Sequence, residues 1–68
     1  MRYAIIIEKS ETGFGAYVPD LPGCVAAGAT LAETETLIRE AVEFHLDGLR
    51  EDGIEVPAPS AVAQYVEV

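Results

Sequence analysis

The sequence has few of the residues that stabilise very small proteins through covalent or metal cross-links. Its 68 residues include one cysteine, Cys24, so no disulfide can form within the chain. No Cys and His spacing typical of a structural zinc site occurs. A chain of this length buries only about 60% of the surface that its unfolded form exposes. We therefore expect self-association, as a dimer or tetramer, to supply part of its stability.

Long apolar runs are also absent. The run Ala4–Ile7 is interrupted by Glu8 and is too short for the hydrophobic region of a signal peptide. No stretch approaches the roughly 18 apolar residues that a membrane-spanning helix requires. A lone thiol fits a reducing compartment. These features predict a cytoplasmic protein without a membrane segment.

Basic residues are scarce. Four Lys and Arg residues stand against twelve Asp and Glu residues, which gives a formal net charge of −8. This balance disfavours binding to nucleic acids and to anionic lipids, because both depend on Lys and Arg. It favours association with a basic protein. The alternative is that the acids only keep a small domain soluble.

Three strands are predicted in the first half of the chain, two from alternating apolar residues and one from a run of small residues. The first two cover residues 2–9 and 14–18, and the short turn between them favours an antiparallel hairpin. Gly13 is expected to take a positive φ in that turn. Pro19 closes the second strand, because proline cannot donate to a ladder. Residues 24–29 form a third strand of small side chains.

The clearest predicted element is a helix over residues 31–51. Thr30 and Glu33 have the spacing of a capping box, and Gly53 suits the left-handed residue beyond the helix end. At 100° per residue, one broad apolar face results. Its residues are Leu31, Leu37, Ile38, Ala41, Val42, Phe44, His45, Leu46 and Leu49.

The predicted element order is β-β-β-α-β. Residues 55–60 are a proline-rich connector, and residues 61–68 alternate like a final strand. Neither a repeat nor a domain linker interrupts the chain. We therefore predict an α+β fold, an antiparallel sheet covered by one long helix, in a single domain over residues 1–68.

No residue pattern indicates a catalytic or cofactor site. His45 lies on the apolar face without a companion nucleophile, and Cys24 is best explained as a small apolar filler. A minimal metal-dependent nuclease would need Glu8, Asp20 and Glu33 around one ion. The helix is expected to hold these carboxylates apart. The sequence thus predicts no catalytic, cofactor-binding or metal-binding residues, and a protein that is not an enzyme.

Four acids share one exposed face of the helix. The i, i+3 and i+4 spacing brings them together as neighbours. They are Glu40, Glu43, Asp47 and Glu51. This face is either simply solvated or a docking surface for a basic partner.

Several blocks of the sequence together resemble a known family. Residues 17–24 read Tyr-Val-Pro-Asp-Leu-Pro-Gly-Cys, and residues 28–33 read Gly-Ala-Thr-Leu-Ala-Glu. Glu40-Ala41 follows within the helix, and residues 53–59 read Gly-Ile-Glu-Val-Pro-Ala-Pro. In order, spacing and residue type, these blocks resemble the HicB-like antitoxins of type II toxin–antitoxin systems.

The resemblance implies a fold, a partner and a cellular role. The fold would be a partial ribonuclease H-like domain, and the partner a small basic HicA-type toxin that cleaves mRNA. The rigid loop after the hairpin would be formed by Pro19, Asp20, Leu21, Pro22 and Gly23. Many members carry a further DNA-binding module for which this sequence has no room, so direct DNA binding is not expected. The alternative is a solitary structural homo-oligomer without a toxin.

Overall fold

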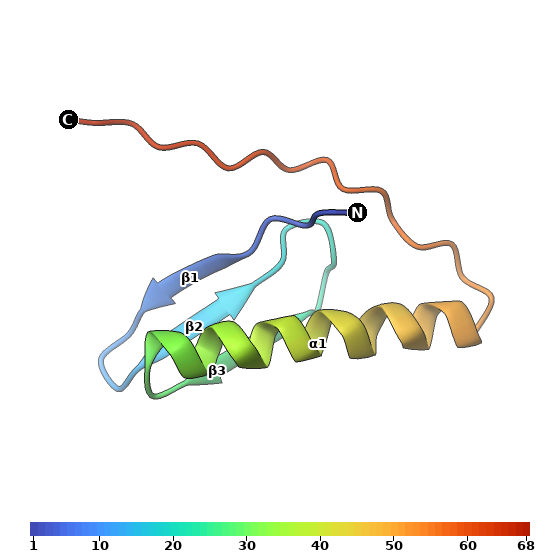
Figure 1. Ribbon diagram of the computed structural model, residues 1–68, viewed down its shortest axis with the longest axis horizontal. Helices are drawn as coiled ribbons and strands as arrows, with labels where there is room; N and C mark the ends of the chain where they lie inside the picture. The colour runs from blue at the N-terminus through green and yellow to red at the C-terminus, as the bar shows by residue number, and fades with distance from the viewer.

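Three strands and one helix make up the regular structure of the chain. A computed structural model describes residues 1–68, with β1 at Ile6–Lys9, β2 at Phe14–Tyr17, β3 at Val25–Gly28 and α1 at Leu31–Glu51. The sheet has the order β1-β2-β3, and both neighbouring pairs are antiparallel. Helix α1 covers one face of this sheet (Figure 1). The predicted α+β fold, the hairpin and the helix are confirmed.

Strand β1 is shorter than predicted because only four residues of β2 pair with it. The paired residues run from Ile6 opposite Tyr17 to Lys9 opposite Phe14. Beyond Tyr17 the chain turns toward β3, where the Val18 amide donates to the Cys24 carbonyl. Residues 2–5 therefore have no strand to pair with, although their alternation suits a strand.

The role expected of Gly13 was wrong. Positive φ angles occur only at Gly23, with 84°, and at Gly53, with 68°. Gly13 is needed for a different reason, because a Cβ there would collide with the carbonyl oxygen of Gly28. A close backbone approach between the turn and the end of β3 thus requires glycine at this position.

Both helix termini follow the sequence signals. The Thr30 hydroxyl accepts a hydrogen bond from the Glu33 amide at 3.1 Å, and Gly53 follows the C-cap residue Asp52. The first turn of α1 lies tightly on β3, since a Cβ at Gly28 would stand 2.7 Å from the Thr34 hydroxyl oxygen. That hydroxyl is buried and donates to the Thr30 carbonyl at 2.8 Å.

The core is small and lies between α1 and the β2–β3 half of the sheet. Its buried residues are Ala16, Val18, Leu21, Cys24 and Ile38. Tyr3, Ile5 and Ile7 pack against it from the first part of the chain. The apolar face of the helix is narrower than predicted, because Phe44 is 83% exposed and Leu31 is half-exposed.

The predicted strand at residues 61–68 does not form. This extended segment leaves the helix end, passes the first residues of the chain and continues beyond β1 (Figure 1). No backbone hydrogen bond joins it to β1. A strand exists only where a neighbouring chain accepts and donates its backbone hydrogen bonds. Within one chain the segment has no such neighbour, so this prediction was wrong for the isolated chain.

Candidate partner-binding surfaces

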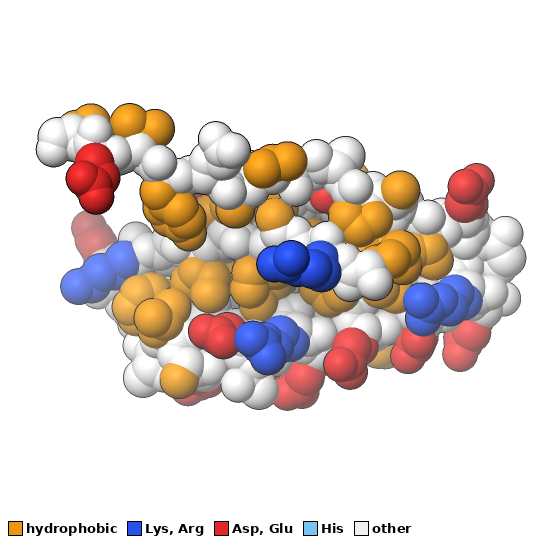
Figure 2. Space-filling view, turned by 45° about the horizontal axis from the view of Figure 1, so that its top comes forward, with side chains coloured by type: hydrophobic (Ala, Val, Ile, Leu, Met, Phe, Trp, Pro, Cys, Tyr) orange, Lys and Arg blue, Asp and Glu red, His pale blue; other side chains and the backbone are white.

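The four acids predicted as a docking face lie on the exposed side of α1. Glu40, Glu43, Asp47 and Glu51 are all exposed, and Phe44 lies among them. Residues three and four positions apart are neighbours on a helix, so the phenyl ring has one carboxylate before it and one after it along the helix. Acidic side chains form a row along the helix in Figure 2. The surface combines an exposed aromatic ring with a row of carboxylates along one side of it.

Few cations neutralise this acidic face. Asp47 pairs with Arg50 at 3.5 Å, and Arg39 pairs with Glu35 at 3.1 Å, outside the face. Glu40, Glu43 and Glu51 take part in no ion pair. Exposed pairs of this kind contribute at most about 1 kcal/mol. The face therefore keeps a negative potential that a cationic partner can neutralise.

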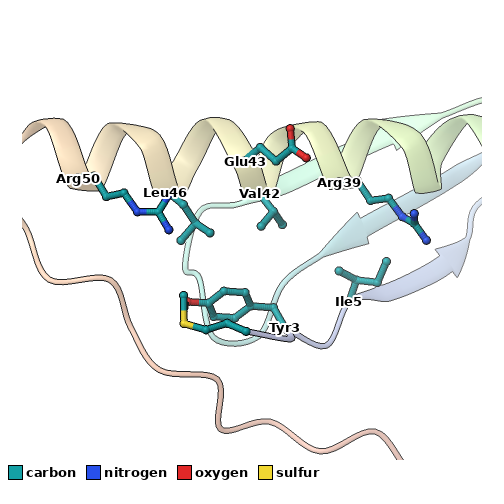
Figure 3. A pocket seen from close by; sticks show the side chains of 8 residues that line it. Tyr3, Ile5, Arg39, Val42, Glu43, Leu46 and Arg50 are labelled. Atoms are coloured by element: carbon teal, nitrogen blue, oxygen red, sulfur yellow. The ribbon is translucent and has the colours of Figure 1, made fainter.

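A second surface is an apolar hollow of about 470 Å³ between the start of the chain and α1. Figure 3 shows Tyr3 and Ile5 on one side and Val42 and Leu46 on the other. The hollow exists because α1 packs mainly over β3 and β2 and leaves the β1 side of the sheet less covered. Sequence patterns did not predict it, since it depends on where the helix crosses the sheet.

The ends of this hollow are basic. Arg39 and Arg50 lie at its two ends in Figure 3, and Glu43 extends from the helix on the side away from Tyr3. Guanidinium groups repel a cationic partner at short range. The hollow is thus less suited than the acidic face to a basic protein.

The loop of residues 19–23 is structural. Leu21 of this loop is almost completely buried in the core, and Gly23 supplies the positive φ that turns the chain into β3. Amides of Leu21 and Cys24 donate to the carbonyls of Val18 and Leu21. The loop is therefore fixed at both ends, and it holds Asp20 in a defined position.

Asp20 fastens the chain beyond the helix to this loop. Its carboxylate accepts hydrogen bonds from the Ser60 amide at 3.0 Å, the Ser60 hydroxyl at 2.8 Å and the Ala61 amide at 3.1 Å. The hydrogen bonds from the Ala61 and Ser60 amides, and then from the Ser60 hydroxyl, lower the pKa of Asp20. No local pattern predicts this contact, because the partners are forty residues apart.

The Asp20 contact is expected to open in acid. A carboxylate with a lowered pKa stabilises the folded state at pH values above its unfolded pKa, and this contribution disappears as pH falls through the folded value. Amide resonances of Ser60 and Ala61, followed by NMR, should therefore titrate together, with a midpoint below the ordinary pKa of an aspartate side chain. The Asp20→Asn chain should lack that transition. An unchanged titration in Asp20→Asn would contradict the assignment.

The remaining candidates for chemistry do not form a site. Cys24 is buried, and desolvation raises the pKa of its thiol, as suits the predicted apolar filler. His45 is half-buried on α1. Glu8, Asp20 and Glu33 do not gather, since no group of three His, Cys, Asp or Glu side chains is arranged to hold a metal ion. The nuclease hypothesis required that arrangement, and the structure does not bring it together.

Comparison with known protein families shows to which family the chain belongs. The profile of the family described as the HicB_like antitoxin of bacterial toxin-antitoxin systems matches residues 3–68. The chain belongs to the HicB-like antitoxin family. This match confirms the resemblance carried by the Val-Pro-Asp-Leu-Pro-Gly-Cys loop and the blocks after it.

Individual relatives come from a phage and from an archaeon. A 14.9 kDa protein from the rep–hol intergenic region of Haemophilus phage HP1 is 44% identical over 66 residues, which are 97% of this chain and 50% of the phage protein. The chain thus spans half the length of that relative. A UPF0150 protein of Thermoplasma acidophilum is 36% identical over 62 residues, with 90% of each chain covered.

A solved structure shares the fold. It is a chain in a HicA3 and HicB3 toxin-antitoxin complex, 37% identical, with a TM-score of 0.75 over 88% of this chain and 70% of that chain. The helix of the present HicB-like chain is not long and apolar enough to cross a membrane.

Proposed function

We propose that this HicB-like chain is an antitoxin that binds and neutralises a small basic HicA-type toxin, an mRNA-cleaving protein of the cytoplasm. The family match and the likeness to a chain of a HicA3–HicB3 complex support this role. The observation that carries the choice of surface is the exposed Phe44 among Glu40, Glu43, Asp47 and Glu51. These acids form the proposed toxin-binding face.

The chemistry of this face matches that of a protein that cleaves RNA. Such a protein presents Lys and Arg side chains that neutralise phosphates. Carboxylates at similar spacing can take the place of those phosphates and block the surface. Aromatic side chains are frequent anchors of protein interfaces, where the surrounding contacts exclude water from them. Phe44 is exposed on α1 next to Glu40 and Asp47 and can serve as such an anchor.

We also propose that residues 1–68 work as one binding domain that is not an enzyme and does not contact DNA directly. The strands, the loop at 19–23 and the helix share one core, and Asp20 ties the chain beyond the helix to it. A net charge of −8 opposes contact with DNA phosphates.

A second candidate function is a solitary structural homo-oligomer without a toxin. Exposed apolar side chains in residues 61–68 favour it, since Val62, Tyr65 and Val66 are all at least 79% exposed. Self-association and toxin binding use different surfaces in this proposal, so one does not exclude the other.

The decisive experiment is co-purification of the tagged chain from its native host, with mass spectrometry and light scattering of the product. We expect a small basic protein in fixed ratio to the chain. That protein alone should then arrest translation when expressed, and co-expression of the HicB-like chain should relieve the arrest. Recovery of the chain without any basic partner would instead support the solitary homo-oligomer.

A further inference from the structure

Residues 2–7, which include the first part of β1, lie opposite the extended segment at residues 61–68 across an unfilled space. Two hollows of about 370 and 300 Å³ lie between them. The first has residues 2–4 on one side and 61–63 on the other, and the second has residues 5–7 opposite 62–65. Residue numbers increase together on both sides, so the segment runs in the same direction as β1 (Figure 1).

Both sides of this space carry unused backbone groups. Strand β1 pairs with β2 on one edge only, which leaves its other edge free. Residues 61–68 make no backbone hydrogen bond with one another or with β1. Free edges of this kind readily accept another strand, because each exposes a row of N–H and C=O groups.

The start of the segment is held in place although the segment pairs with nothing. The Tyr3 hydroxyl donates to the Pro57 carbonyl, and Asp20 holds Ser60 and Ala61 through three hydrogen bonds. These contacts determine where the segment starts, and they leave the space between the segment and β1 open. Apolar side chains gather around this space in Figure 2.

The residues that line this space favour an uncharged strand as its occupant. Among its lining residues only Arg2 is charged, and no acid is present. A basic protein would therefore find no anion there. A second copy of this chain, although it also has a charge of −8, would meet no acid in the space. Its own residues 61–66, Ala-Val-Ala-Gln-Tyr-Val, are uncharged and rich in strand-forming side chains.

We propose that residues 61–68 of a second copy fill the space, so that two chains exchange these segments in a two-fold dimer. The inserted segment runs antiparallel to β1 on one side and to the first copy's own segment on the other. The two-fold axis lies between the two segments, and each copy inserts into the other in the same way. The result is one continuous antiparallel sheet to which each copy contributes its three strands and its segment. The segment thus becomes the missing fourth strand.

A proline in the segment tests this arrangement. Gln64 lines the space, and its amide makes no hydrogen bond within one chain, so Gln64→Pro removes a donor that only the dimer uses. Light scattering should give twice the 7.3 kDa chain mass for the unaltered protein and a single chain mass for Gln64→Pro. The circular dichroism of α1 should stay the same in both. Hydrogen exchange should accelerate in Gln64→Pro at those amides of residues 5–7 that face the free edge and not β2.

The matched control is Ala58→Pro, which lies in the connector before the segment and should remain a dimer. Variants that each add one cysteine at a position from 62 to 66 give a direct readout, because the native Cys24 is buried and antiparallel segments related by a two-fold axis bring one position opposite itself. At least one of these variants should form a disulfide-linked dimer. An unaltered chain that is monomeric overturns the proposal. So does any assembly whose mass and exchange are unaffected by Gln64→Pro.

Discussion

Ile38→Ala is expected to destabilise the fold more than any other single truncation. Ile38 is completely buried at the middle of α1 and belongs to a core of only five buried apolar residues. Removal of a buried isoleucine side chain beyond Cβ costs about 2–5 kcal/mol. A core in a chain this short supplies only about 3–5 kcal/mol of net stability. The variant should therefore be largely unfolded, or melt about 10 °C or more below the unaltered chain in thermal circular dichroism.

Leu31→Ala is the matched control for this prediction. It truncates a side chain of the same volume on the same helix, but Leu31 is 51% exposed. Less apolar surface returns to water, so a cost below about 1 kcal/mol is expected. If the two variants melt at the same temperature, Ile38 does not have the central role in the core that its burial indicates.

The parts of the fold that could be predicted from sequence depend on local signals. Thr30 and Glu33 define the start of α1, and Gly53 defines its end, because capping groups act within one turn of the backbone. The hairpin follows from alternation and a short turn. The family, too, was recognisable from one short loop and the blocks after it.

The parts that could not be predicted depend on contacts distant in sequence. Gly13 was assigned a positive φ from its place in a turn, whereas its actual constraint is the carbonyl of Gly28 on β3. Phe44 was placed in the apolar face by its 100° spacing, but one sheet covers less of the helix than that spacing suggests. Residues 61–68 have strand alternation, yet alternation cannot supply the neighbouring strand that pairing requires.

The candidate site was predictable only in part for the same reason. Helical spacing gives the acidic face, because neighbours on a helix are neighbours in sequence. It does not reveal that Phe44 is exposed beside that face, because this depends on which part of α1 the sheet leaves uncovered. Nor does it reveal that Asp20 holds Ser60. The proposed toxin-binding face is thus an exposed aromatic ring together with acids that the sequence already placed near one another.

Reversal of two acids on this face is expected to weaken toxin binding strongly. In Glu43→Lys/Asp47→Lys, cations on the toxin would meet lysines in place of carboxylates, and like charges brought together across an interface cost several kcal/mol. We expect about a 100-fold loss of affinity, which corresponds to about 2.8 kcal/mol, in titration calorimetry with the purified toxin. The fold should be unaffected, since both side chains are exposed. The loss should shrink at 1 M salt, where screening extends only about 3 Å.

Two further variants distinguish an effect of this face on toxin affinity from an effect of the net charge of the chain. Glu11→Lys/Glu55→Lys changes the charge by the same amount at exposed positions outside α1 and should bind almost as tightly as the unaltered chain. Phe44→Ala leaves the charge at −8 and removes only the apolar anchor. An interface anchor contributes about 2 kcal/mol or more, so a loss of roughly 30-fold is expected for Phe44→Ala. If both double reversals weaken toxin binding equally, the affinity depends on the overall charge of the chain and not on this face. If Phe44→Ala and Glu43→Lys/Asp47→Lys each bind the toxin with full affinity, the toxin binds another surface. The hollow between Tyr3 and Leu46 would then be the next surface to test.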